Sequence, residues 1–191
     1  IEGDADFERV RNSPRFAATA DSLSGLTARE VAGGTVLWID AVAQFPCWLR
    51  LPDPYDSTRT YPLVLGLHGF GSSPESFLAV REYFGATDFF FAALRAPYLA
   101  VQDGFSWSRR DAGPQVDATT TSATIEYIAT TIREIRQRYP VSEVHLLGFS
   151  QGARTAYLAG IRHPELIDGV LAFGGWLETD LLPAGALERG K

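Results

Sequence analysis

With 191 residues, of which 46% are hydrophobic and 21% charged, the chain is long enough to bury one hydrophobic core. Its net charge of −6 and its lack of clustered basic residues argue against nucleic acid or an anionic membrane as a partner, because both bind through concentrated positive charge. Cys47 is the only cysteine, which excludes an internal disulfide and a cysteine-based metal site, and no apolar run is long enough to cross a bilayer.

The first part of the chain carries no recognisable chemistry. We expect residues 1–34 to form an N-terminal appendage and residues 35–191 to form the main domain. The sequence contains no methionine and begins at Ile1, so we expect that the native N-terminus, with any targeting segment, is absent. A cytoplasmic location is favoured and secretion is left open, and the sequence does not indicate an oligomeric state.

Strand patterns recur through the main domain. Residues 35–39 and 47–51 are rich in apolar and β-branched residues and predict an antiparallel pair at a sheet edge. Short apolar runs predict further strands buried in a parallel sheet, at residues 61–67, 88–94, 143–147 and 168–173.

Helical patterns alternate with these strands. The clearest covers residues 119–139, where isoleucines recur at intervals of three and four and Pro140 follows. Shorter helices are predicted at residues 74–84 and 153–162. This alternation predicts an α/β fold with a mostly parallel, doubly wound sheet.

The pentapeptide Gly148-Phe149-Ser150-Gln151-Gly152 lies between a predicted strand and a predicted helix. The pattern Gly-x-Ser-x-Gly is typical of a nucleophile elbow, a sharp turn that holds the serine above the sheet, and its glycines avoid collisions with neighbouring segments. The pattern alone is weak, and the flanking strand and helix make it informative. The alternative is an ordinary strand-turn-helix connection with an incidental serine.

A second glycine-rich loop, His68-Gly69-Phe70-Gly71, follows the predicted strand at 61–67. Both loops leave the carboxyl ends of parallel strands, so we expect them to meet. Acyl transfer needs a nucleophile and N–H donors for the developing oxyanion, and we predict that the backbone N–H groups of Gln151 and Phe70 supply them. The alternative for the second loop is a tight turn into a helix.

Taken together, these motifs resemble the α/β-hydrolase superfamily, and within it the phospholipase/carboxylesterase group, which includes acyl-protein thioesterases and small bacterial esterases. The resemblance spans residues 49–176 and rests on residues 62–73, Arg95-Ala96-Pro97-Tyr98, Trp107 and Gly148 to Gly152. It implies a serine hydrolase that cleaves small carboxylic esters or thioesters, with Ser150 as the nucleophile and with no cofactor or metal. One mild departure is Ala153, where the family often has a second glycine.

Substrate contacts are indicated less clearly. Gly69 and Gly71 would let the backbone approach a substrate closely, and Trp107 is a candidate for lining an acyl or aryl pocket. Aromatic residues at strand ends belong to the core as often as to a pocket, so that alternative stays open for Trp107.

The catalytic triad cannot be completed from this sequence. The fold that the motifs resemble requires the order serine, acid, histidine, and only His163 follows Ser150, about 16 Å away along the predicted elbow helix. His145 lies inside a predicted strand, and His68 precedes the serine. Asp180 occupies a position that some α/β-hydrolases use for the acid, but the resemblance expects the acid after a further strand.

We therefore expect the triad acid and histidine beyond Lys191, in C-terminal strands that this sequence lacks. Two alternatives to an esterase or thioesterase remain. A peptidase of the same superfamily would share the elbow, because both reactions pass through a tetrahedral intermediate. A non-catalytic binding domain of hydrolase type would explain the missing base.

Overall fold

The computed structural model describes residues 13–14, 43–85, 88–100 and 104–177. The chain divides into one unit at residues 1–43 and another at residues 44–191, and the central sheet and its helices belong to the second unit. Apart from Ser13 and Pro14, the predicted appendage at 1–34 and the predicted strand at 35–39 lie outside the described residues.

A five-stranded sheet with the order β1-β3-β2-β6-β7 forms the centre of this unit. Its strands are β1 (Cys47–Arg50), β2 (Tyr61–Leu67), β3 (Phe90–Leu94), β6 (Val141–Phe149) and β7 (Gly169–Phe173). The last four are parallel to one another, and β1 pairs antiparallel with β3 at one end of the sheet. The predicted α/β class with a mostly parallel sheet is confirmed. Residues 35–39, the partner expected for β1, lie outside the described residues, so that pairing stays a prediction.

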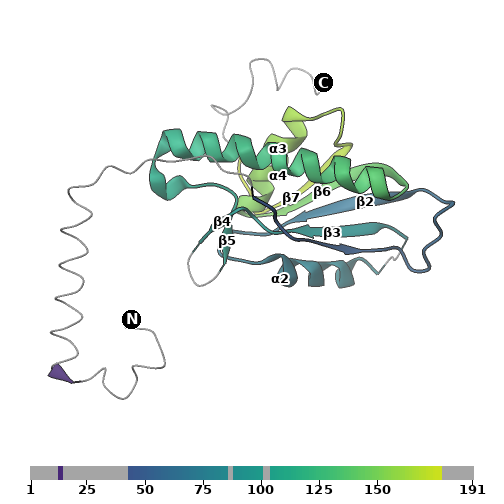
Figure 1. The fold of residues 1–191 in the computed structure, drawn as a ribbon, viewed down its shortest axis with the longest axis horizontal. Helices are drawn as coiled ribbons and strands as arrows, with labels where there is room; N and C mark the ends of the chain where they lie inside the picture. The colour runs from purple at the N-terminus through teal and green to yellow at the C-terminus, as the bar shows by residue number, and fades with distance from the viewer. Residues whose placement is uncertain (1–12, 15–42, 86–87, 101–103, 178–191) are drawn as a thin grey trace. The chain divides into compact units, whose positions relative to one another are not determined.

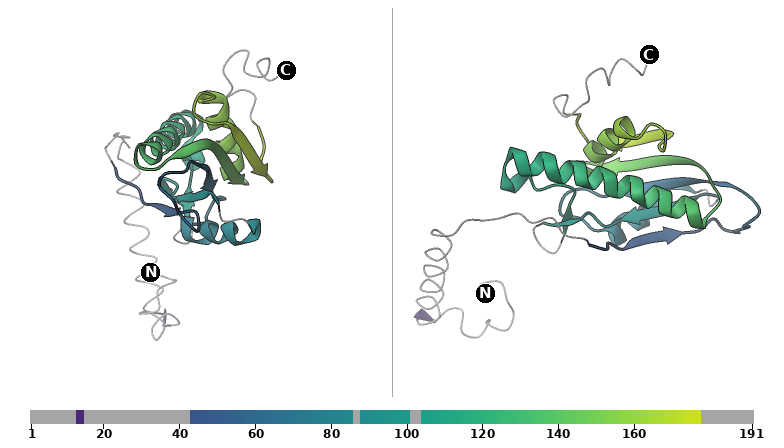
Figure 2. Two further views of the ribbon diagram at one scale, coloured as in Figure 1. Left: turned by 90° about the vertical axis from the view of Figure 1, so that its right-hand side faces the viewer. Right: turned by 45° about the horizontal axis from the view of Figure 1, so that its top comes forward.

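Helices cover the sheet on both faces (Figures 1 and 2). On one face lie α3 (Pro114–Arg138) and α4 (Gln151–Arg162), and on the other lies α2 (Pro74–Leu78). α3 starts five residues earlier than predicted, because Pro114 suits the first helical position and Gly113 before it adopts a φ of 96°. The helix predicted at 74–84 is in fact two pieces, α2 and the 3-10 helix η2 (Ala79–Phe84).

Alternate residues of the central strands pack on opposite faces, as the period of a strand requires. Leu65 and Leu146 belong to the core beneath α3, where the predicted isoleucine stripe is buried, with Ile128 and Ile132 both fully inaccessible. Leu147 belongs to the smaller core on the opposite face, which is completed by the following residues: Phe77, Phe89, Phe91 and Ala93.

A small hairpin lies where only a loop was predicted. β4 (Tyr98–Leu99) pairs antiparallel with β5 (Phe105–Ser106), and two-residue strands carry no periodicity that a sequence could reveal. The hairpin also pairs with the glycine-rich loop after β2. Gly71 N–H donates to the Phe105 carbonyl at 3.0 Å, and Phe105 N–H donates to the Ser72 carbonyl at 2.9 Å. The hairpin therefore supports the loop that was predicted to lie next to the nucleophile.

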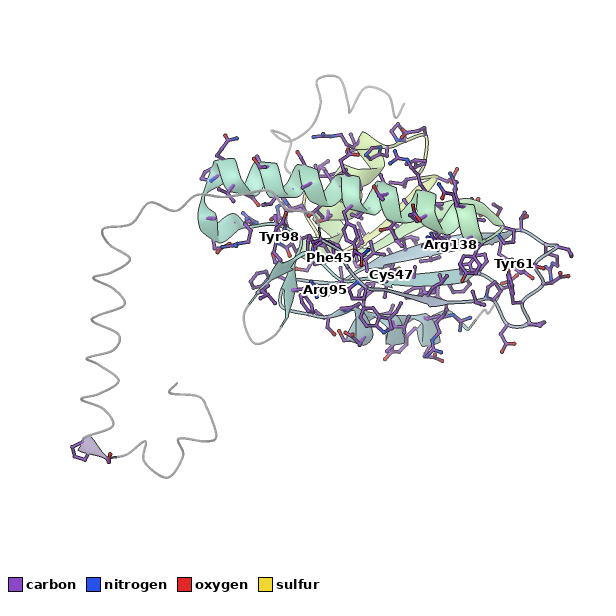
Figure 3. All side chains as sticks on the ribbon, viewed as in Figure 1. Phe45, Cys47, Tyr61, Arg95, Tyr98 and Arg138 are labelled. Carbon is purple, nitrogen blue, oxygen red and sulfur yellow. The ribbon has the colours of Figure 1, made fainter. Side chains whose placement is uncertain are left out.

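Arg95 joins this hairpin to the segment before β1. Its guanidinium lies 5.1 Å from the ring centre of Phe45 and 4.7 Å from that of Phe105, and Figure 3 labels Phe45 and Arg95 on their neighbouring segments. Cations attract the faces of aromatic rings in such arrangements. The hydroxyl of Tyr127 on α3 donates to the Arg95 carbonyl at 3.3 Å. Arg95, which belongs to the motif Arg95-Ala96-Pro97-Tyr98, therefore has a structural role here.

Next to the η3 turn (Arg110–Ala112), which leads into α3, Arg109 forms a two-pronged ion pair with Asp111 at 2.9–3.0 Å.

Candidate active site

Ser150 sits in a sharp, strained turn between β6 and α4. Its φ of 54° and ψ of −116° make it the one non-glycine residue with a positive φ in the described part of the chain. A side chain at Gly152 would bring its Cβ to 2.1 Å from the Leu67 carbonyl oxygen, and one at Gly148 would lie 2.5 Å from the Gly152 carbonyl oxygen. Both neighbours are backbone atoms, so neither glycine can be replaced without moving the turn. This is the geometry expected of a nucleophile elbow.

The loop after β2 lies directly beside this turn. A Cβ placed at Gly69 would be 3.6 Å from the Ser150 Cβ and 3.2 Å from the Phe149 ring. Gly71 adopts a φ of 73°, which favours glycine, and turns the loop toward the β4–β5 hairpin. The structure thus brings together the two glycine-rich loops that were predicted at the carboxyl ends of parallel strands.

Two backbone donors at this junction have no acceptor among the residues that the structure describes. Gln151 is the first residue of α4, and a first helical N–H has no partner within its own helix. Across the described segments, neither the Gln151 N–H nor the Phe70 N–H donates a hydrogen bond. The Ser150 carbonyl, in contrast, accepts from Ala153 and Arg154 at 3.1 and 3.2 Å. Within the described residues, the two candidate oxyanion donors are thus without a hydrogen-bond acceptor.

The side chain of Gln151 has a structural task that no sequence pattern indicated. It is only 3% exposed, its Oε1 accepts from the Trp107 N–H at 3.2 Å, and its Nε2 donates to Ser106 Oγ at 3.0 Å. Ser106 Oγ in turn donates to the Ser108 carbonyl at 2.7 Å. The residue after the nucleophile therefore fixes the segment that follows β5.

Trp107 lies beneath the two loops. It is 1% exposed, its indole Nε1–H donates to the His68 carbonyl at 2.7 Å, and its own carbonyl accepts from Thr124 Oγ1 on α3 at 2.8 Å. The indole has no surface to offer a substrate in this structure. The observation favours the core alternative for Trp107, in which it supports the loop after β2 from below.

Comparisons with known proteins show the family of the chain. A profile described as phospholipase/carboxylesterase matches residues 56–182, which is more than half of the chain. The chain belongs to the phospholipase/carboxylesterase family. A probable carboxylesterase of rice (Oryza sativa subsp. japonica) is 26% identical over 135 residues, which cover 63% of this chain and 51% of the rice protein. The chain thus spans about half the length of the curated relative that it matches.

Solved structures show the same fold. A carboxylesterase from Mesorhizobium loti superposes with a TM-score of 0.61 at 22% identity, covering 73% of this chain and 65% of that one. The esterase PE8 superposes with a TM-score of 0.60 at 21% identity, covering 72% and 66%. The α/β-hydrolase fold inferred from the motifs is therefore confirmed.

Ala153, the departure from the family pattern, is accommodated by a glycine that follows β7. Ala153 is fully buried, and a Cβ at Gly175 would lie 2.4 Å from the Ala153 Cβ. The methyl group of Ala153 occupies space that Gly175 leaves empty, so the elbow keeps its geometry without the second glycine.

His68 is held in place through both ring nitrogens. Its Nε2 accepts from the Ala96 N–H at 3.3 Å, which leaves Nδ1 to donate to the Gly69 carbonyl at 2.8 Å. The side chain is fully buried, and burial lowers the pKa of the imidazole, an effect that its hydrogen bond to Gly69 only partly offsets. A neutral ring with both nitrogens occupied links the loops after β2 and β3, as expected of a structural loop residue.

The other two histidines lie away from Ser150. His145 is on the face of β6, with Nε2 3.4 Å from Glu143 Oε1. His163 follows the last residue of α4, and its two ring nitrogens lie 3.1 Å from carboxylate oxygens of Glu126 and Glu165. Asp180 lies outside the described residues, and the residues that are described hold no cluster of three potential metal ligands and no helix able to span a membrane.

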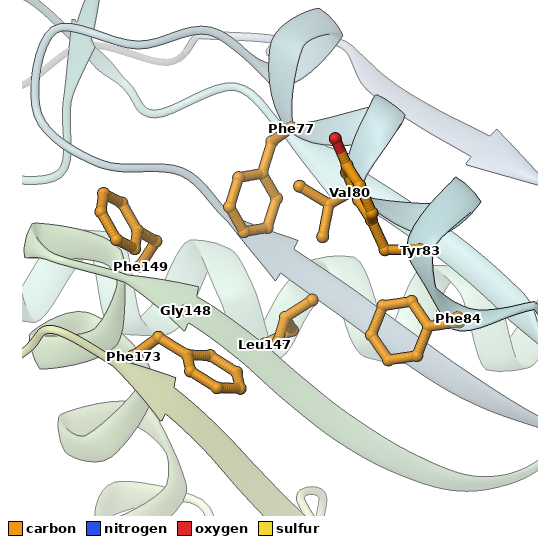
Figure 4. Close-up of a pocket in the computed structure, with 8 residues that line it drawn as sticks. All are labelled: Phe77, Val80, Tyr83, Phe84, Leu147, Gly148, Phe149 and Phe173. Atoms are coloured by element: carbon orange, nitrogen blue, oxygen red, sulfur yellow. The ribbon is translucent and has the colours of Figure 1, made fainter.

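An apolar groove of about 590 Å³ opens beside the elbow on the α2 face of the sheet (Figure 4). Phe149 and Phe173 border it on the side of β6 and β7 and are 54% and 57% exposed. The other lining residues are Phe77, Val80, Tyr83, Phe84, Leu147 and Gly148. Because successive residues of a strand point to opposite faces, Phe149 shares this face with Leu147.

Gly152→Ala should destabilise the fold by about 1–3 kcal/mol. The methyl group of the alanine would overlap the Leu67 carbonyl and push the elbow away from the end of β2. Chemical denaturation measures this loss. Ala153→Gly is the matched control, since it removes a methyl group at the next residue and creates no overlap. Equal stability of Gly152→Ala and the wild type would contradict the close contact.

Acidification should destabilise the protein through His68. The pKa of a histidine in an unfolded chain is about 6.5, and burial lowers the pKa of His68 in the folded protein. As pH falls, the unfolded state therefore binds the proton first. The contribution is complete above about pH 6.5 and is lost progressively below it. Unfolding free energies measured between about pH 7.5 and 5 should fall less steeply in His68→Asn than in the wild type, and identical slopes would argue against this assignment.

Proposed function

We propose that the complete protein hydrolyses carboxylic esters or thioesters through an acyl-enzyme on Ser150. The observation that carries this proposal is the backbone of Ser150, held at a φ of 54° between two glycines that cannot take a side chain. Strain of this kind costs about 1–3 kcal/mol and persists where the surrounding structure enforces it, most often at functional sites. The name of the rice relative, a probable carboxylesterase, and that of the Mesorhizobium carboxylesterase support an ester as the substrate.

In the proposed reaction, Ser150 Oγ attacks the carbonyl carbon of the ester and forms a C–O bond while its proton passes to a general base. The electron pair of the carbonyl moves to the oxygen, where the N–H groups of Phe70 and Gln151 stabilise the negative charge. The tetrahedral intermediate then expels the alcohol or thiol, which takes up the proton. Water, activated by the same base, attacks the acyl-enzyme and releases the carboxylic acid.

None of the three histidines is suited to act as the general base of the proposed reaction. His68 uses both nitrogens in the core, and His145 and His163 lie on the sheet face and at the far end of α4. We therefore propose that the complete protein supplies the triad acid and histidine from beyond Lys191. At the carboxyl edge of β6 they would complete the proposed site of Ser150 and the N–H groups of Phe70 and Gln151.

The missing base also motivates a second candidate, a binding domain that retains the fold but performs no hydrolysis. Both candidates share the groove and the glycine-rich loops, so labelling and turnover must separate them. A peptidase would share the acyl-enzyme, and turnover of short acyl esters against aminoacyl amides separates it from an esterase.

A fluorophosphonate probe should label the complete protein at Ser150, and Ser150→Ala should lose the label together with at least about a thousandfold of ester turnover. Mass spectrometry of the labelled peptide and hydrolysis of p-nitrophenyl esters measure the two effects. Ser142→Ala is the matched control, because Ser142 lies exposed on β6, the strand that leads into the turn at Ser150. Ester turnover that survives Ser150→Ala would refute the proposed mechanism, and a protein with neither label nor turnover would be the binding domain.

A further inference from the structure

A fully buried arginine lies one turn beyond the candidate nucleophile. Arg154 is 0% exposed, and its backbone N–H donates to the Ser150 carbonyl at 3.2 Å. Its Nη2 lies 3.6 Å from Asp117 Oδ2, and its Nη1 donates to Thr121 Oγ1 at 3.4 Å. Both partners lie near the start of α3, so the guanidinium joins the first turns of the elbow helix to those of α3.

The same part of α3 also holds the segment around Trp107. Thr124 Oγ1 donates to the Trp107 carbonyl at 2.8 Å, and the Arg109 N–H donates to Thr120 Oγ1 at 3.0 Å. The Trp107 N–H in turn donates to the Gln151 side chain at 3.2 Å. These contacts close a ring of polar interactions that runs from the elbow through Trp107 to α3 and back through Arg154.

Stability alone does not account for a charge at this position. Burial removes the Arg154 charge from water entirely and that of Asp117, whose side chain is 18% exposed, in large part. Well-packed apolar residues of similar size are often as stabilising as a buried ion pair or more so. Asp117 Oδ1 is buried and has no hydrogen-bond partner in the described segments, which adds to the cost. A planar guanidinium with fixed donor directions can, however, hold two helices in one relative orientation, which flexible apolar side chains cannot do as sharply.

We infer that Arg154, with Asp117 and Thr121, is a positioning residue that sets the direction of the first turn of α4. That direction determines where the Gln151 N–H and the Ser150 hydroxyl point. The catalytic consequence rests on the proposed function, whereas the effect on the elbow backbone does not. Arg154 itself contacts no substrate, because its side chain is fully buried.

The double variant Asp117→Leu/Arg154→Met, made in the complete protein, tests this inference. Its apolar pair should keep the melting temperature within about 4 °C of the wild type or raise it. The rate of fluorophosphonate labelling at Ser150 and the kcat for p-nitrophenyl esters should nevertheless fall about tenfold to a hundredfold, with KM nearly unchanged, because small displacements of reacting groups cost this much. Amide hydrogen exchange across residues 148–158 should become faster.

Glu134→Gln serves as the control, because it breaks the exposed ion pair with Arg138 on the same helix and should change none of these measurements. The inference would be overturned if the double variant showed the labelling rate, the kcat and the amide exchange of residues 148–158 of the wild type. Arg154 and Asp117 would then serve packing alone. If the wild-type protein shows no labelling, the proposed function fails, and the exchange of residues 148–158 still decides whether Arg154 orients the elbow.

Discussion

One close contact, between the first turn of α4 and the end of β2, governs the geometry of the site. A Cβ at Gly152 would lie 2.1 Å from the Leu67 carbonyl oxygen, so only glycine lets the elbow helix begin this near to the central strand. With the helix fixed there, the chain must reverse at Ser150, which takes a φ of 54°. The same closeness brings Gly69 beside Ser150, where a Cβ on Gly69 would lie 3.6 Å from the Ser150 Cβ.

Hydrogen bonds between loops stabilise the strained turn at Ser150. His68 connects the loops after β2 and β3, Trp107 connects the loop after β2 to α3, and the Gln151 side chain connects the elbow to Trp107. All three side chains are at least 97% buried, so water does not compete for these bonds. Buried hydrogen bonds therefore hold the turn at Ser150, and the contacts of Arg154 with Asp117 and Thr121 extend this polar network to the start of α3.

Local patterns predicted the features that local chemistry determines. Glycine spacing located the elbow at Ser150, apolar runs located the parallel strands, and isoleucine spacing located α3, because each depends on residues close in sequence. The burial of Trp107, the second task of Gln151 and the Arg154–Asp117 pair depend on segments up to 45 residues apart, which periodicity does not register. The predictions for residues 35–39 and Asp180 concern positions that the structure does not describe.

The proposed mechanism depends on the oxyanion site, in which the N–H groups of Phe70 and Gln151 would stabilise the negative charge formed when Ser150 attacks the ester. A crystal structure of the complete protein with a phosphonate bound covalently to Ser150 would show this site occupied, because the phosphonyl oxygen imitates the oxyanion. We expect this oxygen within about 2.7–3.2 Å of both nitrogens. A phosphonyl oxygen held by other donors, with Phe70 N–H and Gln151 N–H left unpaired, would show that the oxyanion site is wrongly assigned.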